Sequence, residues 1–140
     1  MTAAPFASAL LLDTNILSYI HRNDPLARRY LPHMQGQALL IAAQTVGELR
    51  YGMFLARWGE RRSAELERLL GLYTVIYPTD GVCTRWARVR AEARHLGHPI
   101  EEADAWIAAT ALELGVPLLT HNRSDFDLLE GLKIISENTP

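Results

Sequence analysis

The 140-residue chain contains a single cysteine, Cys83, and a single lysine, Lys133. One cysteine excludes an internal disulfide and a zinc site built from several cysteines, and it is typical of a cytoplasmic protein. Aliphatic runs such as 38–43 end within about half a dozen residues, whereas a membrane-spanning helix needs about 20. The run 9–12 is too short for a secretory signal and has no Lys or Arg before it. We therefore expect a cytoplasmic protein with no membrane segment.

The net charge is also small, −2 at neutral pH, and the apolar fraction of 49% is too high for a disordered chain. The length suits one globular domain over residues 1–140, with 1–8 as a frayed lead-in. All basic residues except Lys133 are arginines, which suit bidentate phosphate contacts, although a GC-rich genome produces the same bias. Without an excess of positive charge, nucleic-acid binding would need a local basic patch or metal ions.

Short apolar runs alternate with helical patterns along the chain. Five runs are typical of buried strands: 9–12, 38–42, 73–77, 116–120 and, more weakly, 132–135. Helical spacing covers 14–22, 26–34, 44–58, 60–72, 82–96 and 103–114. The fifth helix has an apolar stripe that ends at Leu96, and Gly115 closes the sixth. Because the strands are apolar throughout, both sheet faces must be covered, which predicts an α/β fold, a three-layer α/β/α sandwich with a mainly parallel sheet.

Four acidic residues stand where predicted strands and helices meet. Asp13 ends the first strand, Glu48 lies in the helix after the second, Asp104 in the helix before the fourth, and Asp125 beyond the fourth. Ligands bind at the carboxyl ends of parallel strands, so we expect the four to converge there. Two unit charges about 5 Å apart repel by about 3 kcal/mol at an effective dielectric of 20. His121 is the one lysine or histidine in these segments, so Mg²⁺ or Mn²⁺ is the economical counterion.

Each acid also has a purely structural explanation. Asp13 fits a helix N-cap, 45–48 fits a capping box in which Glu48 reaches back, Asp104 suits a helix N-terminus, and Asp125 suits a turn. Singly, none of the four indicates a site. Together they do, because a cluster of carboxylates requires a partner of opposite charge.

Four motifs in order resemble those of PIN domains: Leu11–Asn15, Val46–Gly52, Pro99–Ala109 and Leu118–Phe126. The resemblance spans about residues 11–135 and is strongest to the VapC toxins of toxin–antitoxin modules. It implies a five-stranded parallel sheet and a metal-dependent endoribonuclease that uses Mg²⁺ or Mn²⁺. The catalytic and metal-binding residues would be Asp13, Glu48, Asp104 and Asp125. Water would attack the phosphorus, which leaves a 5′-phosphate and a 3′-hydroxyl.

The resemblance also implies supporting residues and partners. Hydroxyl and amide groups would orient ligands and water, supplied by Thr14, Asn15, Thr120 and Asn122. Arg50 and Arg123 stand beside the acidic motifs and would contact phosphate or, equally well, pair with nearby acids. Family members form homodimers and are silenced by a VapB-like, DNA-binding antitoxin whose C-terminal segment lies across the active-site groove.

Receiver and haloacid-phosphatase domains share this fold class and its acidic loops. A receiver domain needs a lysine after a late strand, and Lys133 lies too near the end. A haloacid phosphatase needs Asp-x-Asp, whereas 13–15 is Asp-Thr-Asn. A PIN nuclease in RNA processing without an antitoxin, or a non-catalytic PIN-like module, stays open, although the latter would be expected to lack an acid. Trp58 and Tyr51 suit base stacking, but core or dimer packing is their more common use.

Overall fold

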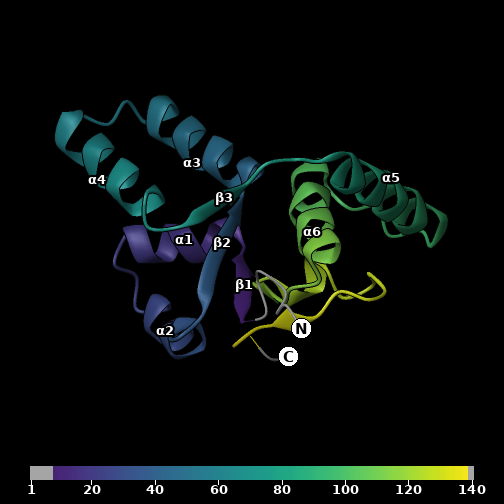
Figure 1. The fold of residues 1–140 in the computed structure, drawn as a ribbon. Coiled ribbons are helices and arrows are strands. Elements are labelled where there is room, and N and C mark those ends of the chain that lie inside the picture. The colour runs from purple at the N-terminus through teal and green to yellow at the C-terminus, as the bar shows by residue number, and fades with distance from the viewer. Residues whose placement is uncertain (1–7, 139–140) are drawn as a thin grey trace.

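A sheet of five parallel strands separates two layers of helices (Figure 1). The computed structural model describes residues 8–138, so nearly all of the predicted lead-in, 1–7, lies outside the described residues. The strands are β1 Ala9–Leu12, β2 Ala38–Ala42, β3 Thr74–Ile76, β4 Leu118–Leu119 and β5 Ile134–Ile135. The helices are α1 Thr14–His21, α2 Ala27–Met34, α3 Ala43–Leu55, α4 Glu60–Leu70, α5 Asp80–His95 and α6 Glu102–Leu114, with a 3₁₀ turn η1 at Arg123–Asp125. The predicted three-layer sandwich and five-stranded parallel sheet are confirmed.

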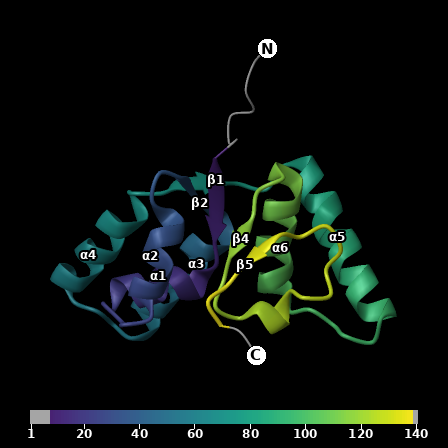
Figure 2. The ribbon, with the colours of Figure 1, turned by 90° about the horizontal axis from the view of Figure 1, so that it is seen from below.

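The central strand β1 contributes to both hydrophobic cores, because successive side chains of a strand point to opposite faces. Leu10 and Leu12 pack with buried side chains of α1, α2 and α4. Ala9 and Leu11 pack with buried side chains of α5 and α6 on the other face. Figure 2 shows the sheet between these two groups of helices. An apolar strand without alternation is therefore required here, as the sequence predicted.

The strand order β3-β2-β1-β4-β5 places a topological switch point between β1 and β4. The chain winds from β1 to β2 and β3 on one side, and β4 and β5 complete the sheet on the other. Ligands bind at such a point, outside the carboxyl ends of the strands. The Asp13 N–H donates to the Leu119 carbonyl oxygen at 2.9 Å, which brings the ends of β1 and β4 together.

Two sequence predictions concern the ends of helices α5 and α6. Gly115 adopts the left-handed conformation (φ 66°) at the end of α6, as predicted. The prediction that Leu96 belongs to the buried stripe of α5 is wrong, because Leu96 is the C-cap of this helix and is 61% exposed. No helix within residues 8–138 is long and apolar enough to cross a membrane.

Candidate active site

Asp13 is the most deeply buried of the four acids, with 4% of its surface exposed. It is the N-cap of α1, and its Oδ1 accepts a hydrogen bond from the Thr14 N–H at 2.8 Å. Its Oδ2 accepts one from the Thr120 hydroxyl at 2.7 Å. Burial raises the pKa of Asp13, these hydrogen bonds lower it, and the charge of Asp125 raises it further. The capping role and the site role therefore coexist in one side chain.

The carboxylate of Glu48 is held by a side chain of α1 and not by the N-terminus of its own helix, α3. The Thr14 hydroxyl donates to Glu48 Oε1 at 2.9 Å, and the Thr45 hydroxyl lies 2.9 Å from that of Thr14. The capping box considered for Thr45 and Glu48 is wrong, because α3 begins at Ala43, one residue after Ala42 as N-cap. Burial raises the pKa of Glu48, as do the charges of Asp13 and Glu101.

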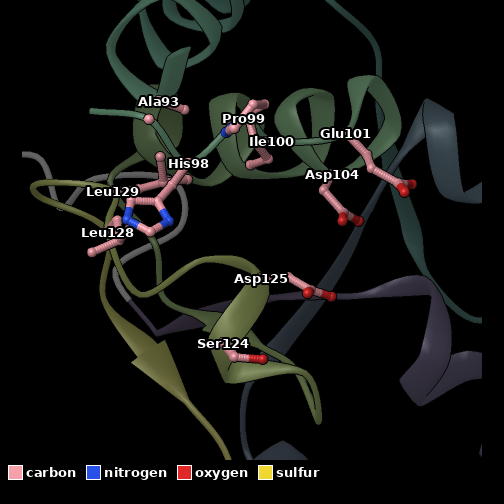
Figure 3. A pocket seen from close by; sticks show the side chains of 11 residues that line it. Ala93, His98, Pro99, Ile100, Glu101, Asp104, Ser124, Asp125, Leu128 and Leu129 are labelled. Carbon is pink, nitrogen blue, oxygen red and sulfur yellow. The ribbon is translucent and has the colours of Figure 1, made fainter. Parts of the chain in front are cut away.

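Asp104 shows how crowded the negative charges are. It lies in the first turn of α6, is half-buried, and has a pKa raised to about 7. Burial is the largest cause, followed by the charges of Asp13, Asp125, Glu101 and Glu48. Figure 3 shows the carboxylates of Asp104 and Asp125 facing the same space, in a cavity of about 520 Å³ that Glu101 and Ser124 also line. The four predicted acids thus converge at the switch point.

Glu101, which lies inside the motif Pro99–Ala109, is a fifth acid near the site that the sequence patterns did not single out. It is the N-cap of α6, and its charge raises the pKa of both Glu48 and Asp104. Its position three residues before Asp104 is the sequence signal that could have identified Glu101, because side chains three positions apart share one face of a helix.

The acids have no cationic partner among the described residues. The salt bridges of residues 8–138 join other acids to Arg22, Arg50, Arg61, Arg85, Arg123 and His33. Nor do any three carboxylate, imidazole or thiol groups in this range already form a compact cage for an ion. Spaced carboxylate oxygens without a counter-cation suit a hard divalent ion that keeps several water ligands, as Mg²⁺ does.

The two candidate phosphate arginines are engaged elsewhere. Arg50 makes a bidentate ion pair with Glu67 of α4, with N–O distances of 2.9 and 3.0 Å. Arg123 lies 3.9 Å from Asp127 and donates to the Ile134 carbonyl oxygen. The ion-pairing alternative therefore describes their geometry, and phosphate contact stays a prediction.

The supporting residues divide in two. Thr14 and Thr120 hold carboxylates directly, as described above. The Asn122 N–H donates to Thr120 Oγ1 at 3.0 Å, just before the turn that carries Asp125. Asn15 and Asn122 are half-buried near the acids, and the ligand-orienting role of their side chains stays a prediction.

The PIN domain model matches residues 10–132, which include all four acids. The chain belongs to the PIN domain family. Ribonuclease VapC1 of Haemophilus influenzae (strain R2866) is 31% identical over 88% of this chain and 93% of its own. VapC ribonuclease Y4jK of Sinorhizobium fredii is 34% identical over 94% of this chain and 99% of its own.

Structural similarity extends over the same range. The structure of VapBC-1 from nontypeable Haemophilus influenzae matches this PIN domain with a TM-score of 0.79 and 30% identity, covering 91% of this chain and 97% of that one. The resemblance predicted from four motifs is therefore confirmed, and the chain is a VapC-type PIN domain.

Proposed function

We propose that this PIN domain is a metal-dependent endoribonuclease and the toxin of a VapBC-type toxin–antitoxin module. One observation carries the proposal: four acids far apart in sequence meet at the switch point with no cationic partner in residues 8–138, and the pKa of Asp104 rises to about 7. The names of its relatives, ribonuclease VapC1 and VapC ribonuclease Y4jK, support the reaction class.

The donor set fits one or two Mg²⁺ or Mn²⁺ ions held by Asp13, Glu48, Asp104 and Asp125. When bound, such an ion lowers the pKa of a coordinated water and supplies hydroxide near neutral pH. The chain's own contribution is to fix the carboxylates. Both oxygens of Asp13 are engaged, and Thr14 restrains Glu48. Because water and not the RNA 2′-hydroxyl is the nucleophile, we expect 5′-phosphate and 3′-hydroxyl ends.

We further infer a VapB-like, DNA-binding antitoxin as partner, a homodimer as the assembly and the cytoplasm as the compartment. The structural relative VapBC-1 supports the antitoxin. A PIN nuclease of RNA processing would share the active site but act without that partner. A non-catalytic PIN module is disfavoured because Asp13, Glu48, Asp104 and Asp125 are all present.

Inducible expression in bacteria without the antitoxin tests nuclease and toxin roles together. We expect wild-type protein to arrest growth and to create new RNA 5′ ends, which sequencing of total RNA maps. Asp13→Asn and Asp104→Asn should abolish both effects, with thermal melting confirming that each variant is folded. Asp80→Asn, at the exposed start of α5, is the matched control and should behave as wild type.

The outcomes separate the two roles. If both site variants produce the same 5′ ends as wild type, the ribonuclease assignment is wrong. If wild-type protein is abundant and cleaves RNA with Mg²⁺ after purification, yet cells grow normally, the toxin role is wrong and the nuclease remains.

A further inference from the structure

A second cavity of about 320 Å³ adjoins the acidic site. The two share a boundary, because Thr14 and Glu48 line this cavity as well. Its other walls come from Ser18 and His21 of α1, Gly52 of α3 and Trp58 in the loop before α4. The volume lies at the lower end of the range for small-molecule sites. The cavity therefore has room for about one nucleoside beside the carboxylates.

One wall of this cavity is a stacked aromatic pair. The rings of His21 and Trp58 lie with centroids 5.1 Å apart and an interplanar angle of 22°. The Arg62 guanidinium carbon lies 3.9 Å from the centre of the Trp58 ring. The backbone N–H of Trp58 donates to the Met53 carbonyl oxygen, and the Ser63 hydroxyl donates to the Trp58 carbonyl oxygen, so the backbone that carries the Trp58 ring is anchored.

Gly52 keeps the cavity open. It lies inside α3, where glycine is a poor helix former. A Cβ added at Gly52 would meet no atom within 4 Å, so packing within residues 8–138 does not require a glycine there. A larger side chain at position 52 would instead project into open space that this cavity provides.

We propose that this cavity binds one nucleobase of the RNA strand, next to the phosphodiester bond that is cleaved at the acidic site. The proposal rests on the ribonuclease function proposed above. Any planar nucleobase can stack on aromatic side chains, and guanidinium groups bind the neighbouring phosphates. Arg22, which lines the same cavity and is exposed, supplies such a group. A peptide segment of a protein partner is the competing occupant, and it has no need of a stacked wall that continues into the acidic site.

Binding is tested on the full-length protein in EDTA, where no cleavage occurs. The three indole N–H signals of the ¹⁵N-labelled chain are followed while each of the four ribonucleoside 5′-monophosphates is added, and Trp58→Phe assigns the Trp58 signal. Ribose 5-phosphate is the probe that lacks a base. We expect nucleotides to shift the Trp58 signal saturably and ribose 5-phosphate to leave it unmoved, with Trp86 and Trp106 as internal references.

Gly52→Leu fills the cavity without removing any contact, and Gly47→Leu is its matched control. Both replace a helical glycine of α3 whose added Cβ meets nothing within 4 Å, but Gly47 borders a different cavity. We expect Gly52→Leu to abolish the Trp58 shift and to raise the KM for a single-stranded RNA about tenfold, the loss of one base–aromatic stack. Gly47→Leu should change neither.

The possible results are distinguishable. If Gly52→Leu leaves both the Trp58 shift and KM unchanged, the base pocket is wrong and the ribonuclease stands. If wild-type protein does not cleave RNA at all, the proposed function fails, while the titration still decides whether the cavity takes a base. If Gly52→Leu abolishes inhibition by a protein partner without changing RNA binding, the cavity belongs to that partner and the proposal is overturned.

Discussion

At the scale of single residues, a threonine hydroxyl holds the buried centre of the acidic site. Thr120 is fully buried, and its Oγ1 both donates to Asp13 and accepts from the Asn122 N–H. One hydroxyl thus joins the carboxylate after β1 to the loop after β4. The position of Asp13 depends on this link because its other partner, the Thr14 N–H, belongs to its own helix.

Thr120→Val preserves the shape of this side chain and removes the hydroxyl. We expect it to destabilise the fold by about 1–3 kcal/mol, because a buried carboxylate and an N–H lose their partner. Cleavage should fall about 10- to 100-fold, as for other residues that orient metal ligands. Urea unfolding and RNA cleavage measure the two effects. Thr110→Val is the control, because the buried Thr110 hydroxyl donates to the Trp106 carbonyl oxygen within α6 and does not contact the acids. Equal RNA cleavage by the two variants would contradict the role of Thr120.

At the scale of elements, the strands and helices were predictable because each carries its own signal. The four residues of β1 are all buried, as an unbroken apolar run predicts. What the sequence could not show were contacts between elements. The Thr45 hydroxyl faces Thr14 of α1, 31 positions away, and Arg50 pairs with Glu67 across α3 and α4. Local patterns fitted Thr45 to a cap and left Arg50 equally suited to a phosphate or to a nearby acid, because the actual partner is visible only after the helices pack.

The segment after β5 offers a second test between elements. The hydroxyl of Tyr30, a fully buried residue of α2, bonds to Nδ1 of His121 and accepts a hydrogen bond from the Glu137 N–H. His33 and Arg29 of the same helix also bind Glu137. Tyr30 therefore joins α2, the loop after β4 and the chain after β5, three segments that approach one another only in the folded protein.

Tyr30→Phe removes this junction and keeps the ring. We expect a loss of about 1–2 kcal/mol in the free energy of unfolding, because the half-buried imidazole of His121 and the Glu137 N–H lose a partner. Amide hydrogen exchange at Glu137 should accelerate, and urea unfolding should show the stability loss. Tyr77→Phe, at an exposed ring, is the matched control and should change neither measurement. Unchanged protection of the Glu137 amide would show that Tyr30 does not anchor this segment.

At the scale of the whole molecule, stability and cation binding are linked through the acidic site. The net charge is only −2, yet five carboxylates, those of Asp13, Glu48, Asp104, Asp125 and Glu101, gather at one end of the sheet. The fold must hold these charges together without a cationic partner from residues 8–138. Without a bound cation, the folded chain is therefore least favoured when all of them are ionised.

The pH dependence follows from Asp104, whose pKa rises from 3.8 to about 7 on folding. The unfolded chain releases this proton near pH 4, so the folded state binds more protons between pH 4 and 7 and loses stability as pH rises. Because Asp104 is only half-buried and partly screened, we expect about 1 kcal/mol, or about 2–4 °C in Tm, between pH 5.5 and 8 in EDTA. Mg²⁺ should restore Tm at pH 8 and have less effect at pH 5.5, where a proton competes with the ion.

Thermal melting of Asp104→Asn isolates the contribution of Asp104. His21, whose burial lowers its pKa, changes stability with pH in the opposite direction, but it does so equally in both proteins. A wild-type Tm that depends on pH and Mg²⁺ no more than that of Asp104→Asn would mean that the carboxylates do not repel one another enough to need an ion.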